Sequence, residues 1–225
     1  MLKLFIIKKN HLFFILVLAC SFGFSPSVIA QEQVGVIAGG SAVGLASRTA
    51  QGNTVNTGGV RLRYHGGLTY FSSDESLPYG FRGLLMYSNK GQGAGNRSTG
   101  RTDTHLHYIN LALEFAYEVM DDVYLYAGME PGVLVNAQQR FDQTNNPNTA
   151  RGEGVINITD QYNFYDLSVS LGAEYRFQSG FFASFRYAYG VVNIMSSDPD
   201  LNNATGSAGR LFNTRASYLS FGWYF

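Results

Sequence analysis

Strict alternation of apolar and small or polar residues constrains this chain more than any other feature, and it is clearest at the carboxyl end. From position 219 onward every second residue is large and apolar: Leu219, Phe221, Trp223 and Phe225. A period of two residues is that of a β-strand with one apolar face. A lone strand of this kind exposes edges that aggregate, whereas a strand in a closed barrel has two neighbours. The pattern therefore predicts a barrel whose apolar face meets lipid.

Eight segments alternate for long enough to be strands, and we expect them at 33–47, 59–71, 79–91, 105–119, 122–136, 163–177, 180–194 and 212–225. The segment 163–177 alternates most regularly. Its apolar face carries Tyr165, Leu167, Val169, Leu171, Ala173, Tyr175 and Phe177. Its polar face carries Asp166, Ser168, Ser170, Gly172, Glu174 and Arg176. This division predicts an apolar outer wall and a polar interior.

The connections between these segments alternate in length. Short connections are expected at 72–78, 120–122 and 178–180, and long polar ones at 92–104, 137–162 and 195–211. Outer-membrane barrels have short periplasmic turns and long external loops. The chain is therefore predicted to be all-β, an eight-stranded antiparallel transmembrane barrel of the outer membrane. A ten-stranded barrel and a soluble periplasmic sandwich are the alternatives.

The amino end has the pattern of a secretory signal peptide. Three lysines precede an apolar run at 12–24, and small residues follow at Val28 and Ala30. We expect residues 1–30 to be removed and residues 31–225 to form one barrel domain. Cys20, the only cysteine, lies within the apolar run. Cleavage and lipidation at Cys20 is the alternative; without it, residues 31–225 have no thiol for disulfides or catalysis.

Composition supports a membrane barrel and excludes some functions. Charged residues make up 14% of the chain, below the roughly 25% of soluble domains, and there are 15 Tyr and 17 Phe. Three of the 16 basic residues lie in the signal segment, against 16 acidic residues in the chain. The sequence contains no basic patch that would indicate a nucleic-acid partner.

The predicted inward faces carry many charged side chains. We interpret the following as a lumen charge network: Arg61, Arg63, Arg82, Glu114, Glu130, Asp166, Glu174, Arg176 and Arg186, with His65 and Glu118 on the same faces. Eight strands enclose a lumen only wide enough for side chains to fill. Opposite charges must pair there, because an isolated buried charge costs several kcal/mol. We expect a plugged lumen, and a narrow path for ions or small solutes is the alternative.

Two further groups of residues could in principle carry chemistry. Asp103, His105 and His107 share one strand face and could chelate a divalent metal. Because no fourth ligand is identifiable, we interpret them as interfacial polar residues and predict no metal or cofactor. Some small barrels are lipid-modifying enzymes that use Ser and His. None of the histidines beyond residue 30 is adjacent to a serine in sequence, so no enzyme is predicted and no catalytic residue is assigned.

Aromatic residues are expected to form belts at the two membrane surfaces. The periplasmic belt would comprise Tyr117, Tyr175, Phe177, Phe181 and Trp223. The external belt would comprise Tyr87, Tyr108, Tyr165 and Tyr189.

Several motifs resemble those of a known family. They are the segments 84–91 (LLMYSNKG), 108–111 (YINL), 124–128 (YLYAG), 172–175 (GAEY) and 185–194 (FRYAYGVVNI). Together they resemble the PorT-like, "porin family" outer-membrane barrels common in Bacteroidota, over nearly all of 31–225. The resemblance implies a barrel in the outer membrane, not an activity. The family usually has proline directly after the glycine of the fifth strand, where this chain has Met129.

The carboxyl-terminal alternation of Phe221, Trp223 and Phe225 also resembles the signal that the barrel-assembly machinery reads. That machinery, outer-membrane lipid and lipopolysaccharide are the expected partners. The favoured function is a structural or surface-interaction role, with an extracellular partner bound through the loop 137–162. A porin-like narrow channel is the second hypothesis, and a lipid-modifying enzyme is the third.

Overall fold

The computed structural model describes residues 30–48, 54–56, 59–74, 76–94, 101–142, 154–196 and 211–225. The chain divides into two units, Met1–Ala30 and Gln31–Phe225. All described residues except Ala30 belong to the second unit. The predicted signal segment 1–30 thus lies, apart from Ala30, outside the described residues.

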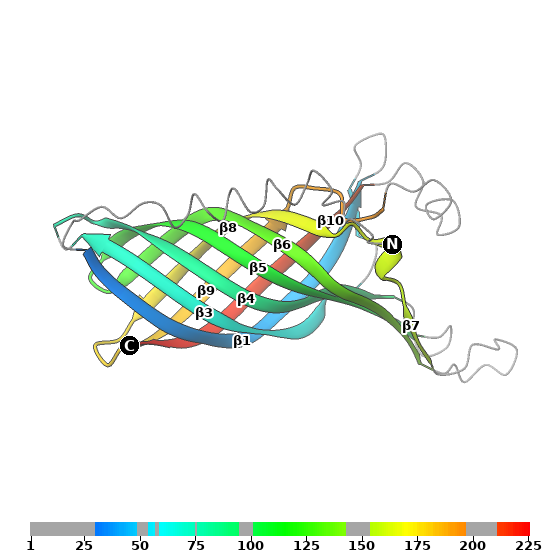
Figure 1. Ribbon diagram of the computed structural model, residues 1–225, viewed down its shortest axis with the longest axis horizontal. Helices are drawn as coiled ribbons and strands as arrows, with labels where there is room; N and C mark the ends of the chain where they lie inside the picture. The colour runs from blue at the N-terminus through cyan, green and yellow to red at the C-terminus, as the bar shows by residue number, and fades with distance from the viewer. Residues whose placement is uncertain are drawn as a thin grey trace, which may run out of the picture. The chain divides into compact units, whose positions relative to one another are not determined.

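Eight long strands close into an antiparallel barrel, which confirms the predicted fold (Figure 1). They are β1 (Ala30–Arg48), β3 (Arg61–Asp74), β4 (Tyr79–Ala94), β5 (Arg101–Met120), β6 (Val123–Asp142), β8 (Tyr165–Arg176), β9 (Phe181–Gly190) and β10 (Leu211–Tyr224). Each long strand pairs with the next long strand along the chain. The barrel closes where β1 pairs with β10, in a register that runs from Gly35 with Tyr224 to Arg48 with Leu211.

Three short elements accompany the barrel. β2 (Thr54–Asn56) pairs with the end of β1, and β7 (Gly154–Asn157) pairs with the end of β6. The 3₁₀-helix η1 spans Thr159–Gln161. Within the part of the chain that the structure describes, no helix is long and apolar enough to cross a membrane.

The two ends of the barrel differ. Short turns join β3 to β4, β5 to β6 and β8 to β9 at one end, which we call the turn end. The longer connections join strands at the opposite end, the loop end. In Figure 1 the carboxyl terminus lies at the turn end and β7 at the other. Asp122, with φ of 65°, and Gly180, with φ of 83°, supply the left-handed backbone that two of the tight turns need.

Strand alternation sorts side chains as the sequence predicts. On β8, Val169 and Leu171 lie on the outer face with 46% and 65% of their surface exposed, while Ser168 and Ser170 are buried inside. On β9, Phe185 faces outward and Arg186 is buried. Large exposed apolar residues cover the outer wall, so the wall is one that hydrocarbon would solvate and water would not.

The belt residues expected at the turn end lie on the outer wall: Tyr117, Tyr175, Phe177 and Trp223 are exposed, and Phe181 is partly exposed. Ring contacts join Tyr175 to Phe177 and Phe177 to Phe181. At the loop end Tyr87 and Tyr165 are exposed. The assignment of Tyr108 to the external belt was wrong, because the alternation of β5 turns this side chain into the lumen, where it is fully buried.

The predicted loop 137–162 is partly strand. β6 continues to Asp142, and β7 returns alongside it with pairs from Gln138 with Asn157 to Phe141 with Gly154. β5 likewise begins at Arg101, within the predicted loop 92–104. These extensions carry no alternating apolar face that would mark them as strands, because they continue past the barrel wall and gain their order from backbone pairing.

Candidate functional site

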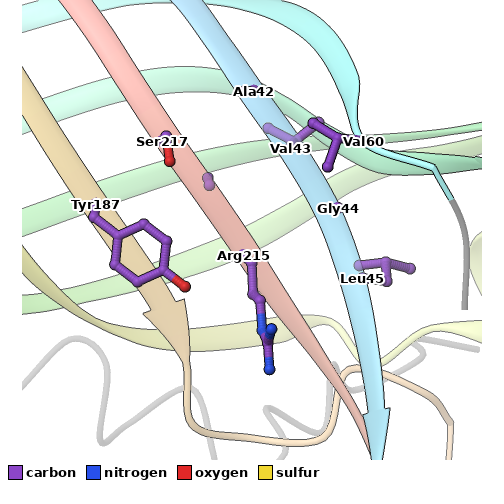
Figure 2. Close-up of a pocket in the computed structure, with 9 residues that line it drawn as sticks. Ala42, Val43, Gly44, Leu45, Val60, Tyr187, Arg215 and Ser217 are labelled. Atoms are coloured by element: carbon purple, nitrogen blue, oxygen red, sulfur yellow. The ribbon is translucent and has the colours of Figure 1, made fainter. Parts of the chain in front are cut away.

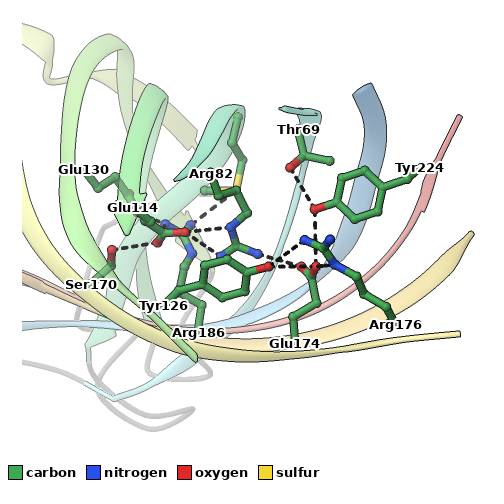
Figure 3. Close-up of polar contacts among 11 residues, drawn as sticks. Thr69, Arg82, Glu114, Tyr126, Glu130, Ser170, Glu174, Arg176, Arg186 and Tyr224 are labelled. Carbon is green, nitrogen blue, oxygen red and sulfur yellow. Dashed lines mark hydrogen bonds and ion pairs between the residues drawn. The ribbon is translucent and has the colours of Figure 1, made fainter. Parts of the chain in front are cut away.

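Eight charged side chains, all buried except the part-buried Arg176, form one continuous chain of ion pairs inside the barrel. Figure 3 shows the part of it that runs from Arg176 to Glu130. Cations and carboxylates alternate along it in the order Arg176, Glu174, Arg82, Glu114, Arg186, Glu130, Lys90 and Asp166. We call this set the charge chain. Its members come from β4, β5, β6, β8 and β9, so it crosses the lumen repeatedly.

The charge chain begins near the turn end with two residues of the same strand face. Arg176 Nε donates to Glu174 Oε1 at 2.9 Å. The Arg176 guanidinium also lies over the rings of Phe71 and Tyr124, at 3.7 Å and 4.1 Å from their centroids. Stacking on aromatic faces stabilises a cation in a place where little water reaches it.

The middle of the charge chain is centred on Arg82. Its Nη1 donates to Glu174 Oε2 at 2.7 Å, and its Nε donates to Glu114 Oε2 at 2.8 Å. The guanidinium carbon lies 3.6 Å from the centroid of the Tyr126 ring. The Tyr126 hydroxyl in turn donates to Glu174 at 2.9 Å. The planar guanidinium thus bridges two carboxylates and packs on an aromatic face, which a lysine could not do.

The charge chain continues toward the loop end through Arg186. Arg186 Nη1 lies 3.6 Å from Glu114 Oε1 and donates to Glu130 Oε2 at 2.5 Å. Lys90 Nζ then donates to Glu130 at 3.2 Å and to Asp166 at 3.1 Å. The Thr214 hydroxyl donates to the same Asp166 oxygen at 2.9 Å.

The charge balance explains why these groups tolerate burial. Four cations face four carboxylates, and seven of the eight side chains are no more than 3% exposed. Ionised groups are buried only when they are paired and hydrogen-bonded, and removing one partner leaves an uncompensated charge. The charge chain therefore fills the lumen with mutually dependent ion pairs and links five strands.

Apolar side chains fill the lumen further toward the loop end. The cluster comprises Leu45, Leu106, Tyr108, Leu134, Ala137, Ile158, Ile194, Met195 and Phe212. Segments beyond the strand ends contribute to it, since Ile158 precedes η1 and Met195 follows β9. Asn163 Nδ2 ties these two segments together by donating to the carbonyl oxygens of Asn193 and Met195. A charged layer and an apolar layer thus fill the lumen in series.

The structure separates two of the predicted lumen residues from the rest. Arg61 and Arg63 both pair with Asp103, at 3.6 Å and 2.6 Å. The regular pairing of β3 with β4 ends at His65 with Ser88, and both arginines lie beyond it toward the loop end. Alternation along a single strand cannot show where the pairing with the next strand ends, which is why the sequence grouped both arginines with Arg82 in one lumen network.

Sequence reasoning missed Lys90, which joins Glu130 to Asp166. The signal was present, because Lys90 lies an even number of residues from Arg82 on the same strand. Strand alternation alone would have turned it inward.

His65 forms a buried pair with a residue distant in sequence. Its Nε2 lies 2.7 Å from Ser220 Oγ, and the two residues are 155 positions apart. His65 Nδ1 has no hydrogen-bond partner among the described residues. A serine nucleophile requires a base that a third group orients. Because nothing among the described residues bonds to His65 Nδ1, the His65–Ser220 pair lacks that orienting group. Glu118, also predicted inward, accepts a hydrogen bond from the backbone N–H of Asp122 at the turn.

The predicted metal candidates are neighbours, with the rings of His105 and His107 stacked at 6.3 Å, but they contact different polar partners. His105 Nε2 lies 3.7 Å from Asp103, whereas His107 Nδ1 lies 2.5 Å from the Tyr87 hydroxyl. Among the residues that the structure describes, no three His, Cys, Asp or Glu side chains are grouped to hold a metal ion. The carboxyl-terminal residues Phe221, Trp223 and Phe225 are exposed on the outer wall.

The closed antiparallel barrel, its apolar outer wall and its charged interior define the class of outer-membrane β-barrel proteins. The chain belongs to the family described as "Outer membrane protein beta-barrel domain", whose model matches residues 29–196. Membership of this family implies that the protein resides in the outer membrane. No curated protein matches the chain.

Several solved structures are similar to this chain. Ail of Yersinia pestis, solved in complex with the heparin analogue sucrose octasulfate, is 12% identical with a TM-score of 0.45. That match covers 86% of this chain and 99% of Ail. Neisserial surface protein A is 12% identical with a TM-score of 0.43, covering 87% and 97%. OprG of Pseudomonas aeruginosa is 11% identical with a TM-score of 0.40, covering 86% and 95%.

Proposed function

We propose that this protein is a closed barrel that holds a protein-binding β-sheet above the outer membrane. The observation that carries the proposal is the extension of β5 and β6 beyond the barrel, with β7 added as a further strand. β5 and β6 are 20 residues long. A strand crosses a bilayer in about 9–11 residues, so roughly half of each strand lies outside the membrane. The tight turn at 120–123 fixes that excess at the loop end, which in such barrels faces the cell exterior.

β7 offers an open edge for partner recognition. Among the described strands it pairs only with β6. Val155 and Ile156 are 60% and 46% exposed, on opposite faces of the strand. Unpaired backbone groups beside apolar side chains are a template for an added strand. An extended segment of a partner protein would gain main-chain hydrogen bonds there, and side-chain contacts would supply specificity.

The filled lumen supports this role over the two alternative hypotheses. The charge chain and the apolar cluster around Leu106 and Tyr108 occupy the space that a solute path would need. The buried His65–Ser220 pair lies inside the barrel and lacks an orienting acid. Neither observation favours a channel or a lipid-modifying enzyme, and we propose that the protein is neither.

Cell adhesion tests the proposed surface interaction. Cells that express the wild-type protein are applied to a panel of immobilised extracellular proteins, and adherence is compared with that of cells without the protein. Val155→Lys/Ile156→Lys places charges on the edge strand, which discourages strand addition. We expect this variant to lose the adherence. Leu77→Lys, in a turn at the opposite end, is the matched control and should retain it. Equal adherence by the edge variant and the wild type would refute the proposal.

Three finer assignments are part of this proposal. The amino-terminal pattern at 1–30 supports a cleaved signal peptide. The motifs at 84–91 and 185–194 support a PorT-like subgroup. The exposed outer-wall positions of Phe221, Trp223 and Phe225 are compatible with recognition by the barrel-assembly machinery.

A further inference from the structure

A groove of about 310 Å³ lies on the barrel where β10 meets β1 (Figure 2). Outward-facing residues paired across β9, β10 and β1 form two rows over it. One row is Tyr187, Ser217 and Ala42, and the other is Tyr189, Arg215 and Gly44. The groove therefore opens on the wall that carries Phe185, Leu219 and Phe221, which is the side of the barrel that meets lipid.

Small residues leave a recess in this part of the outer wall. Ala42, Gly44 and Ser217 form the floor, and Tyr187 and Val60 stand on either side. A Cβ atom added to Gly44 would meet only Val60 Cγ2, at 3.9 Å. The floor is therefore open space and not backbone in close contact. Small residues let an apolar chain approach the wall closely and gain van der Waals contact along its length.

Arg215 lies at the loop-end side of this floor and has no anionic partner among the described residues. Its guanidinium carbon lies 5.4 Å from the centroid of the Tyr189 ring. Its Nε is buried without a hydrogen-bond partner. Figure 2 shows its side chain extending in the direction of the β1 arrowhead, toward the loop end. The outward residues of β10 nearer the turn end are Ser217, Leu219, Phe221 and Trp223, so Arg215 is the charged residue on the outer face of this strand.

We propose that this groove binds an acyl chain of a phosphorylated outer-leaflet glycolipid, whose phosphate group pairs with Arg215. An arginine at a membrane surface extends its charged end toward the headgroups. Its planar fork matches phosphate oxygens, and such charge-assisted hydrogen bonds are about twice as strong as neutral ones. The small-residue floor lies on the membrane side of Arg215, where the acyl chain of the same molecule would run.

The position of Arg215 favours a glycolipid over a phospholipid. The residue lies four positions from the start of β10, near the loop end, which faces the exterior in an outer-membrane barrel. The external leaflet of that membrane is built mainly of phosphorylated glycolipid, and phospholipid occupies the periplasmic leaflet. The inference depends on the outer-membrane location and not on the edge strand β7, so the Val155→Lys/Ile156→Lys variant should bind lipid normally.

Native mass spectrometry of the full protein in detergent micelles tests the site. Lipid A, dephosphorylated lipid A and phosphatidylglycerol are titrated separately, and the dissociation constant of the tightest lipid is determined for each. We expect lipid A to bind at least about tenfold more tightly than the other two, because only lipid A combines the acyl chains with a phosphate placed to bond to Arg215. Heat-modifiable migration on a gel verifies that each variant is folded.

Four variants locate the site. Arg215→Gln removes the cation, and Gly44→Leu fills the floor without a backbone clash; each should weaken lipid A binding about tenfold. Arg215→Lys keeps the charge and should retain most of the affinity. Gly83→Leu makes the same substitution at another outward glycine with open space, where the nearest atom is 4.0 Å away, and should leave binding unchanged.

Three outcomes would overturn the proposal. The first is equal lipid A affinity in the wild type, Arg215→Gln and Gly44→Leu. The second is phosphatidylglycerol binding as tight as lipid A binding, which would assign the groove to phospholipid. The third is undiminished binding of dephosphorylated lipid A, which would leave Arg215 without a role.

Discussion

Arg186 on β9 and Glu130 on β6 meet inside the barrel, with Nη1 2.5 Å from Oε2. The two strands are not neighbours, because β8 lies between them in the sheet. The contact therefore reaches past β8 inside the barrel and does not join adjacent strands. Both side chains are buried and both have a second partner of opposite charge, Glu114 for Arg186 and Lys90 for Glu130. The pair thus couples the two halves of the charge chain.

Breaking this pair from one side should destabilise the barrel strongly. Arg186→Leu leaves Glu130 and Glu114 with less compensating charge in a place that water does not reach. We expect a loss of about 3–5 kcal/mol in the free energy of unfolding. Urea titration of the protein refolded in micelles, followed by heat-modifiable migration, measures it. The double variant Arg186→Leu/Glu130→Leu should recover part of the loss; a double variant less stable than the single one would contradict this account.

The filled lumen predicts an electrically silent protein. The charge chain and the apolar cluster that includes Leu106, Leu134 and Phe212 lie in series along the lumen. Wild-type protein inserted into planar bilayers should give no steady conductance steps at neutral pH. Bilayers treated with detergent alone serve as the baseline. Reproducible, wide steps that depend on the protein would show an open path and overturn the assignment of a closed barrel.

Gly128 should tolerate no side chain. It faces the lumen on β6 and pairs with Glu114 of β5, and an added Cβ would overlap the carbonyl oxygen of Leu113. We expect Gly128→Ala to lower the free energy of unfolding by about 1–3 kcal/mol, because the backbone must shift. Gly83 is the comparison, since its Cβ position is open. Gly83→Ala should change stability by no more than about 0.5 kcal/mol, and equal effects at both sites would count against the geometry.

The turn between β5 and β6 depends on a left-handed residue. Asp122 has φ of 65°, a conformation that aspartate adopts far more readily than a β-branched residue does. Asp122→Val should therefore cost about 1–2 kcal/mol of stability, whereas Asp122→Gly should be close to neutral. Equilibrium unfolding of the two variants in parallel tests the comparison. Similar stability of the valine and glycine variants would contradict it.

The turn between β3 and β4 contains a carboxyl group with a shifted pKa. The Ser76 hydroxyl and backbone N–H both donate to Asp74 and lower the pKa of its carboxyl below 3.8. A pKa that is lower in the folded state adds stability above the unfolded pKa, and this is lost as pH falls through the folded value. Ser76→Ala should raise the pKa of Asp74 toward 3.8 and flatten this acid dependence. Carboxyl ¹³C NMR titration measures the pKa; an unchanged value would contradict the assignment.

The sequence by itself determined the barrel wall. On β8 and β9 the alternation is so regular that the residues facing outward and inward could be assigned before any pairing was known. This works because a strand turns successive side chains to opposite faces, and because lipid and a filled lumen select opposite residue types. The same alternation turns Lys90 on β4 and Tyr108 on β5 into the lumen, where both are buried.

Only the tertiary structure decided which charges meet and how the loop end is built. Glu130 and Arg186 are 56 positions apart, and His65 and Ser220 are 155 apart. Such contacts depend on the relative offset of all the strands around the closed barrel, which no local pattern encodes. Beyond the membrane the strands have no lipid to select an apolar face, so the extensions of β5 and β6 leave little trace in the sequence. Register and closure thus decided both the charge chain and the protruding sheet.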